Sequence, residues 1–366
     1  MSLLSPSPAS FALSASDRPR SGVRSQRSYP HFDWLRIVLA SLVALSHQGM
    51  PTIGPIDASL PVIVFLALSG WLIGGILFET PVSGLPRFFF NRATRIWIPY
   101  LVAVVLLYGV AAWREGVTGY WLKYLFYDLT FTHTIFTEFP RALSEMPLKG
   151  TGNHFWSISV EELFYLAAPL AILFLPFGKK LWGWAGIVLL LLALHPNFAA
   201  IALGVFAALA ARQFPGWYLQ PRMQIVLWLG CATAFALCWR YDGEAQRALF
   251  AVLLVQCLAL PGQRNGIGMF LGAVSYPFYL NHWMGAFAVN WLAKALPPMP
   301  AGMWIFASYL VALMAGIATW ALVDRVVMRA RDGWYQPRVG ILLTVTAYGL
   351  LVTGLVGGTI IRSMGG

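Results

Sequence analysis

Long apolar runs separated by short polar segments dominate the chain. Eleven runs can be distinguished, near residues 34–50, 58–78, 96–113, 158–176, 181–194, 198–211, 223–239, 247–261, 267–292, 302–323 and 339–361. A helix that crosses a bilayer takes about 20 mostly apolar residues. In lipid the backbone must satisfy its own hydrogen bonds, which a helix does, and the strict alternation of a membrane barrel is absent. The pattern predicts an all-α, polytopic membrane bundle of about 10–11 transmembrane helices.

Two of these runs are short and flank the turn-like segment His195-Pro196-Asn197. Proline and asparagine together favour a break in a helix. The stretch around 181–211 is therefore either two separate spans or one broken pair.

Composition agrees with a lipid-facing surface. The chain is 58% hydrophobic and 11% charged, whereas soluble domains carry roughly 25% charged residues. The net charge of +11 comes from basic residues spread over short loops, so it indicates a bilayer partner and no nucleic acid. With a cytoplasmic N-terminus, 17 of the 25 lysine and arginine residues lie on the inner side. The positive-inside bias then predicts a multi-pass protein with its N-terminus in the cytoplasm.

The chain divides into a short leading segment and one large domain. Residues 1–30 combine four arginines with many Ser and Pro residues, a composition that predicts a disordered basic segment. Residues 31–366 form a single transmembrane domain. Its three cysteines, Cys231, Cys238 and Cys257, lie in apolar runs. We expect them to be core residues, and no metal-ligand spacing is present.

The connection 114–156 is the longest and most aromatic one, and it is predicted to lie outside. Long connections in compact proteins are usually functional, which favours a lid or a substrate surface. The alternative is a segment at the membrane interface held by Trp121, Tyr124 and Tyr127. Both interpretations stay open.

Two charged or titratable residues lie inside the first run. Arg36 and His47 are eleven residues apart, so they share a helix face and lie roughly 16 Å apart along its axis. Polar residues inside a span usually face a cavity or a partner. The alternatives are an ion pair of Arg36 with Asp33 and a hydrogen-bonded interface role for His47.

A pair of arginines precedes the third run. Arg92 and Arg95 are three residues apart, so their guanidinium groups share one helix face. Two such groups are suited to binding phosphates. The alternative is an ordinary positively charged anchor at the inner membrane surface.

Adjacent carboxylates open the fourth run, in the stretch 153–165. Glu161 and Glu162 are offset by about 100° around a helix, and Ser157 shares a face with Glu161. One glutamate is expected to point into the bundle. The alternative is helix capping by Ser157 or Ser159, with both glutamates meeting the helix dipole.

The ninth run contains Ser275-Tyr-Pro-Phe-Tyr-Leu-Asn281-His282-Trp283. His282 is a candidate substrate residue, or it makes a buried hydrogen bond beside a proline kink. In the second run Gly70 and Gly74 form a GxxxG step that predicts close helix packing.

The predicted orientation separates these residues by membrane depth. His47, Glu161, Glu162 and His282 fall in the outer half, and Arg36, Arg92 and Arg95 fall in the inner half. No P-loop or Rossmann fingerprint is present, so the bundle itself must hold any nucleotide.

Four of these stretches together resemble the membrane-bound acyltransferase 3 family of bacterial O-acyltransferases. They are Arg36-x10-His47, Arg92-x-x-Arg95, Trp156-Ser-Ile-Ser-Val-Glu-Glu-Leu-Phe-Tyr165 and Ser275-Tyr-Pro-Phe-Tyr-Leu-Asn-His282-Trp283. The resemblance spans roughly residues 31–325. It implies transfer of an acyl group, usually acetyl, from cytoplasmic acyl-CoA to a hydroxyl of an envelope glycan, lipid-linked sugar or glycoside. It also implies a bacterial inner membrane.

Carried over to this chain, the resemblance assigns candidate roles. The candidate catalytic residues are His47 and Glu161 or Glu162; those for acyl-CoA are Arg36, Arg92 and Arg95; those for the acceptor are Trp156, Asn281 and His282. His47 would take the acceptor's proton while a glutamate orients its ring, or it would form a transient acyl-histidine.

Two other classes of membrane protein also need buried polar residues. A glycan or lipid transporter or flippase needs intramembrane charges and a cavity. A glycosyl or phosphoryl transferase with a lipid-linked donor usually needs acidic metal ligands, and only Glu161 and Glu162 lie clearly inside a run.

Overall fold

The computed structural model describes residues 28–138, 140–295 and 300–364, and this part of the chain is all-α apart from one isolated bridge between Ile53 and Ile56. Residues 1–27 of the predicted basic segment 1–30 lie outside the described residues. The elements, in order, are α1 Pro30–His47, α2 Ser59–Glu79, η2 Val82–Gly84, α3 Leu85–Glu115, α4 Gly119–Leu129, α5 His133–Phe136, α6 Arg141–Glu145, α7 Pro147–Gly150, η3 Thr151–Phe155, α8 Trp156–Leu173, α9 Leu181–Leu194, α10 Pro196–Gln213, η4 Trp217–Leu219, α11 Pro221–Tyr241, α12 Glu244–Leu258, α13 Gly266–Asn281, α14 Trp283–Leu292, α15 Ala301–Thr319, η5 Trp320–Asp324, α16 Arg325–Trp334 and α17 Pro337–Ser363.

Six helical segments of the described chain are long and apolar enough to cross a membrane. They are Ser59–Glu79, Val82–Glu115, Pro147–Leu173, Pro221–Tyr241, Ala301–Trp334 and Pro337–Ser363. Leu181–Leu194 and Phe198–Gln213 are apolar but shorter. The chain is therefore a multi-pass membrane protein, and fewer helices reach full spanning length than the eleven apolar runs predict.

All eleven apolar runs lie on helices, but their boundaries differ from the predicted ones. α3 already begins at Leu85, so both arginines of the Arg92/Arg95 pair lie within it. The run 267–292 is divided between α13 and α14 at His282. The run 302–323 continues through the π-helical turn η5 into α16. The break at 195–197 is confirmed, because α9 ends at Leu194 and α10 begins at Pro196.

The GxxxG step in α2 packs closely against α10, as predicted. A Cβ atom at Gly70 would lie 2.0 Å from the carbonyl oxygen of Ile201, and one at Gly204 would lie 2.1 Å from that of Ala67. Any side chain at either position would force the two backbones apart. Small residues of this kind allow helices to approach closely where no water drives them together.

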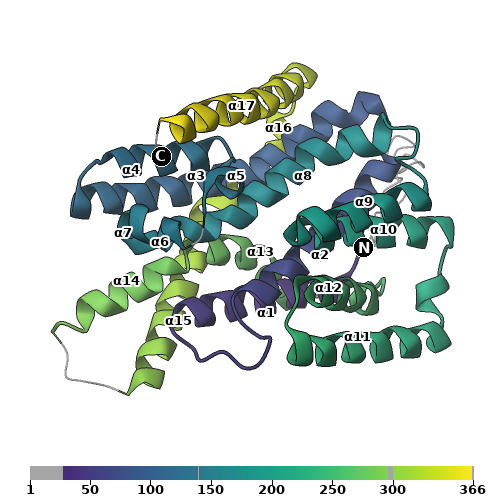
Figure 1. The fold of residues 1–366 in the computed structure, drawn as a ribbon, viewed down its shortest axis with the longest axis horizontal. Coiled ribbons are helices and arrows are strands. Elements are labelled where there is room, and N and C mark those ends of the chain that lie inside the picture. The colour runs from purple at the N-terminus through teal and green to yellow at the C-terminus, as the bar shows by residue number, and fades with distance from the viewer. Residues whose placement is uncertain (1–27, 139, 296–299, 365–366) are drawn as a thin grey trace, which may run out of the picture.

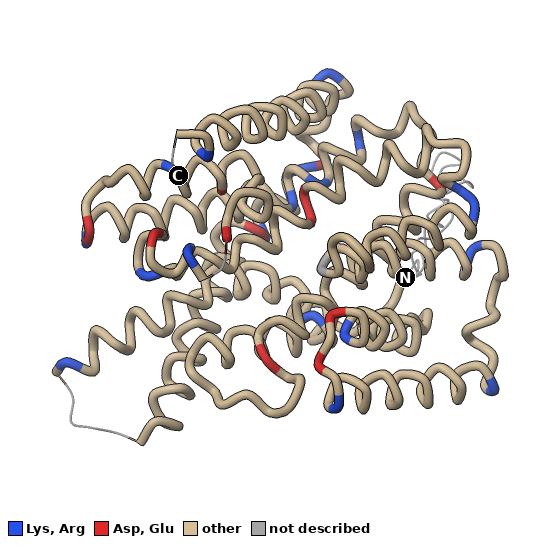
Figure 2. Tube along the Cα trace, in the orientation of Figure 1, with Lys and Arg blue, Asp and Glu red and all other residues tan. Residues whose placement is uncertain are grey.

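Two helices far apart in sequence run side by side in the same direction. Asp33 near the start of α1 lies against Gly272 of α13, and His47 at the end of α1 lies against His282 just beyond α13. Figure 1 shows α1 and α13 near the centre of the molecule, with α17 along one edge. Most charged residues lie at helix ends and in connections, and a few lie along the central helices (Figure 2).

The long connection 116–155 is folded onto the bundle as α4 to α7 and η3. Tyr124 and Tyr127 are buried, and Nε1 of Trp121 donates to the carbonyl oxygen of Tyr108 on α3 at 3.0 Å. The two tyrosines are therefore enclosed by protein. Their rings contact each other, His133 and Phe136 within the segment, whereas Trp121 attaches the segment to Tyr108 of α3.

Candidate functional site

One cavity of about 400 Å³ lies among α1, α2, α3, α8 and α13. Its size falls within the range typical of small-molecule sites. Six charged side chains line it, namely Asp33, Arg36, Arg92, Arg95, Glu161 and Arg264. The structure thus brings together all three arginines that the sequence predicted and one of the two glutamates.

The cavity is long and changes character along its length. Val62 and Ile76 both line it, and their fourteen-residue separation on α2 corresponds to about 21 Å. Ser28, Tyr29 and Arg264 line the end near the start of α1, whereas Phe65, Ser157 and Tyr279 line the far end. Such a shape is suited to a long ligand with an anionic part and a less polar part.

Asp33 organises the arginines near the start of α1. Arg264 binds this buried carboxylate through Nε at 2.6 Å and Nη2 at 2.7 Å, and Nη1 of Arg36 lies 3.4 Å from it. The Arg36–Asp33 ion pair considered from the sequence is confirmed. Arg36 nevertheless also faces the cavity, so the two interpretations of this residue are compatible.

Arg92 and Arg95 differ from this cluster because neither forms an ion pair with a described residue. Both line the cavity, as expected for side chains three residues apart on α3. Nε of Arg92 is buried without a hydrogen-bond partner in the described chain, and its guanidinium lies 5.9 Å from the Phe88 ring centroid. Arg92 is half-buried and Arg95 is exposed, and a charged side chain inside a membrane segment usually faces a cavity or a partner.

The two adjacent glutamates point to different neighbours. Glu161 lines the cavity and accepts hydrogen bonds from Ser69 at 2.6 Å and from Tyr165 at 3.3 Å. Glu162 is buried and accepts from Nε1 of Trp97 on α3 at 2.9 Å. The offset of about 100° per residue separates them in this way, and only Glu161 faces the cavity.

The capping interpretation of this motif is wrong. α8 begins at Trp156, and its N-cap residue Phe155 makes no side-chain capping bond. The hydroxyl of Ser157 instead lies 2.7 Å from the hydroxyl of Tyr279 on α13. Ser157 and Glu161 both line the cavity, so they share a face as predicted.

Beyond the far end of the cavity, three imidazole rings lie together. The centroid of His282 is 4.9 Å from that of His47 and 4.8 Å from that of His154. None of the three rings lines the cavity. His47 is exposed, while His154 and His282 are buried.

Hydrogen bonds fix the tautomers of His47 and His282. Nδ1 of His47 lies 2.9 Å from the carbonyl oxygen of Val43, and Nδ1 of His282 lies 2.6 Å from that of Tyr279. A carbonyl oxygen only accepts, so Nδ1 carries the proton and Nε2 presents its lone pair. No described residue hydrogen-bonds to Nε2 of either ring. Each therefore has the form that a general base requires.

His154 has a different arrangement. Its Nδ1 lies 3.0 Å from the carbonyl oxygen of Thr151, and its Nε2 lies 3.2 Å from that of Leu280. Both nitrogens are directed at backbone carbonyl oxygens, so neither is directed at a substrate. His154 ties η3 to the end of α13.

The structure does not bring either glutamate to His47. The hydrogen bonds of Glu161 and Glu162 go to α2, α3 and α8, while Val43 orients the His47 ring. The expected glutamate–imidazole pair is therefore absent from the described contacts. Trp156 is half-buried against the core. The buried side chain of Asn281 donates to the carbonyl oxygen of Pro277 at 3.0 Å.

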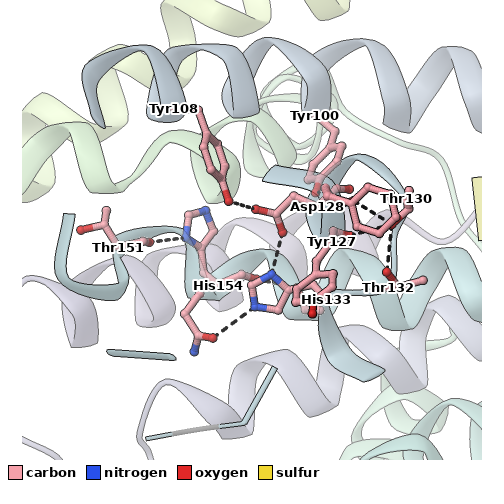
Figure 3. Close-up of polar contacts among 12 residues, drawn as sticks. Tyr100, Tyr108, Tyr127, Asp128, Thr130, Thr132, His133, Thr151 and His154 are labelled. Atoms are coloured by element: carbon pink, nitrogen blue, oxygen red, sulfur yellow. Dashed lines mark hydrogen bonds and ion pairs between the residues drawn. The ribbon is translucent and has the colours of Figure 1, made fainter. Parts of the chain in front are cut away.

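Sequence reasoning missed a buried polar cluster beside the imidazoles (Figure 3). Asp128 and His133 are both 0% exposed, and their side chains are joined at 2.6 Å. The hydroxyl of Tyr108 donates to the other oxygen of Asp128 at 2.6 Å, and Nε2 of His133 lies 3.3 Å from Oδ1 of Asn153. Asn153 directly precedes His154, so the cluster fixes η3. The only signal in the sequence was a charged residue and a histidine five positions apart in the aromatic connection.

In the described part of the chain, no group of three or more His, Cys, Asp or Glu side chains is placed to hold a metal ion. The three cysteines are free and buried, which confirms that they are core residues. Comparison with family models, with curated protein sequences and with solved structures found no match for this chain.

Proposed function

We propose that this chain is a membrane O-acyltransferase. It moves an acyl group, such as acetyl, from cytoplasmic acyl-CoA to a hydroxyl of an envelope glycan, lipid-linked sugar or glycoside. The proposal places it in a bacterial inner membrane with its N-terminus in the cytoplasm. The observation that carries it is the pair Arg92 and Arg95, which have no carboxylate partner and line a cavity that extends about 21 Å along α2.

The charge of the cavity supports an anionic ligand with several phosphates. Four arginines face it, and the carboxylates that line it are Asp33 and Glu161. Arginine forks bind phosphate oxygens in pairs, and they do so most strongly where water is scarce. CoA has phosphates at one end and a long, thin arm that ends in the thioester. The phosphates would lie near Arg36, Arg92 and Arg95, with the arm directed toward Ser157 and Tyr279.

The imidazole pair supports base catalysis at the far end. Nε2 of the exposed residue His47 would remove the proton from the acceptor hydroxyl while the hydroxyl oxygen attacks the thioester carbonyl. A C–O bond forms, the C–S bond breaks, and the CoA sulfur leaves as a thiolate that takes up a proton. The Val43 carbonyl holds the His47 ring in the required tautomer. Glu161 offsets part of the arginine charge on the cavity wall.

The deciding experiment follows acyl-CoA itself. Purified protein in proteoliposomes is given acetyl-CoA labelled in the acetyl group, together with lipid and glycan extracts of the envelope. We expect free CoA to be released and the label to appear on a sugar hydroxyl, and mass spectrometry of envelope glycans to show the acetyl mass difference with and without the gene. Movement of a glycan or lipid across the bilayer without consumption of acetyl-CoA would establish a transporter instead.

A further inference from the structure

We infer that Tyr279 closes the cavity on the side of the imidazole pair and so favours the acceptor hydroxyl over water. This inference rests on the proposed acyl transfer. It assigns a positioning role to Tyr279. The ring separates a thioester in the cavity from the imidazoles until the acceptor is in place. Three observations carry it: where the ring lies, how its hydroxyl is held, and which of the imidazoles beyond it is exposed.

The Tyr279 ring lies between the cavity and the imidazoles. It lines the cavity, where it contacts Phe65 at a centroid distance of 6.3 Å. Its centroid is also 5.9 Å from that of His154 and 6.0 Å from that of His282. Since none of the imidazoles lines the cavity, the phenol ring is part of the wall that separates them from it.

The Tyr279 hydroxyl is held by two partners. It lies 2.7 Å from the hydroxyl of Ser157 and 3.0 Å from the carbonyl oxygen of His154, and Ser157 lies 3.3 Å from that same carbonyl. The two hydroxyl groups and the carbonyl oxygen can satisfy one another without any further partner. Either hydroxyl donates to the other, and the second donates to the carbonyl. The side chain is thus fixed in the closing position.

The carbonyl that receives these bonds is itself fixed. The His154 ring is tied to Thr151 and Leu280, and the preceding Asn153 is tied to the buried Asp128–His133 pair. A rigid wall of this kind excludes water from a reactive intermediate, which is one use of a closed site. The part that has to move when the acceptor arrives is therefore the Tyr279 side chain and not η3.

On the opposite side of this wall His47 is exposed, at the last residue of α1. If Tyr279 were absent, the Nε2 of His47 would be able to activate water against a thioester in the cavity. Water oxygen would then bond to the acyl carbon, the C–S bond would break, and the products would be a carboxylic acid and CoA. Closure by Tyr279 prevents this loss until the acceptor displaces the phenol.

The first experiment measures hydrolysis of acetyl-CoA without any acceptor. We expect Tyr279→Ala to raise the rate of CoA release by about tenfold or more, because it removes a ring held by two hydrogen bonds. Tyr279→Phe, which keeps the ring, is expected to have a smaller effect. Tyr309→Ala is the matched control, because the Tyr309 hydroxyl is also held, 3.0 Å from that of Ser41, but its ring does not line the cavity. Unchanged hydrolysis in Tyr279→Ala, in an enzyme that still transfers acetyl, would overturn the inference.

The second experiment tests closure without using activity. In a background with Cys231, Cys238 and Cys257 replaced by alanine, Leu66→Cys places a thiol on the cavity wall. A membrane-impermeant thiol reagent is added from the His47 side. We expect labelling only when Tyr279→Ala is also present, whereas reagent from the opposite side labels both proteins. Equal labelling from the His47 side, with and without Tyr279→Ala, would overturn closure by this residue. Failure of the protein to consume acetyl-CoA would overturn only the acyl-transfer proposal.

Discussion

The imidazole rings of His47 and His282 lie 4.9 Å apart, although one ends the first helix and the other follows α13. The parallel course of α1 and α13 brings them together. Each ring donates Nδ1–H to a backbone carbonyl of its own helix, so two unprotonated Nε2 atoms lie in the same region. Only His47 is exposed, which distinguishes the roles of the two residues.

Replacing His47 is expected to remove the general base. His47→Ala should lower acetyl transfer by roughly 10²–10⁴-fold, with the protein present in the membrane at its normal level. His195→Ala is the control, because His195 lies in the exposed break between α9 and α10. The measurement is the initial rate of CoA release in the presence of acceptor. Turnover retained in His47→Ala would remove this residue from the mechanism.

Replacing either unpaired arginine is expected to weaken CoA binding. Arg92→Ala or Arg95→Ala should raise the dissociation constant for CoA by about 10- to 100-fold, the value of a hydrogen bond to a charged group. Titration calorimetry in detergent gives the constant. Arg329→Ala serves as the control, because Arg329 is exposed and does not line the cavity. Dissociation constants that stay equal in all three variants would exclude the phosphate site.

The two glutamates are expected to respond differently to the same change. Glu161→Gln alters a cavity carboxylate beside the arginines, so kcat or KM should change. Glu162→Gln keeps an oxygen for Nε1 of Trp97 and alters a side chain that does not line the cavity, so we expect the transfer rate to remain close to that of the wild type. Steady-state kinetics of both variants decide this. A loss of activity confined to Glu162→Gln would reverse the assignment.

The Asp128–His133 pair is expected to stabilise the fold. Asp128→Ala leaves His133 and Tyr108 without their buried partner, which should lower the free energy of unfolding by about 3–5 kcal/mol. Tyr108→Phe removes one hydrogen bond and should cost about 1 kcal/mol. Thermal unfolding of the purified proteins measures both. Similar stabilities for the two variants would show that the pair makes no special contribution.

Glu145, on the short helix α6, gives a prediction for pH. Burial of its carboxyl raises its pKa, but hydrogen bonds from Lys123 at 2.8 Å, from Arg141 at 2.5 Å and from Tyr124 at 3.0 Å outweigh burial and hold the pKa below its ordinary value. A carboxylate whose pKa is lowered in the folded state adds stability above its ordinary pKa of about 4.3. That contribution is lost as the pH falls through the lowered value.

The variant that tests this is Glu145→Gln. At pH 7 it should lower the free energy of unfolding by about 1–3 kcal/mol, and the difference from the wild type should shrink as the solution is made more acidic than the lowered pKa. Melting curves across the acidic range give the comparison. A difference that stays constant at all pH values would assign the effect to packing instead of charge.

Several features of the site follow from local geometry, and these the sequence predicted. Helix periodicity places Arg92 beside Arg95 and Ser157 above Glu161, and the apolar runs predict an all-α membrane protein. The close step at Gly70 and Gly74 was also recognisable, because small residues four positions apart allow two helices to meet. Each of these conclusions depends only on residues that are close in sequence on one helix.

Other features depend on which helices are neighbours, and only the tertiary structure decided them. The cavity joins arginines from α1 and α3 to Glu161 of α8, while Glu162 faces Trp97. The Tyr279 ring, which no spacing singled out, separates this cavity from His47. Helix periodicity gives the direction in which a side chain points around the axis of its helix. It does not identify the residue that the side chain contacts. Partners are set by backbone approach between distant segments, such as Gly70 against Ile201, and a single sequence carries no local signal for that pairing.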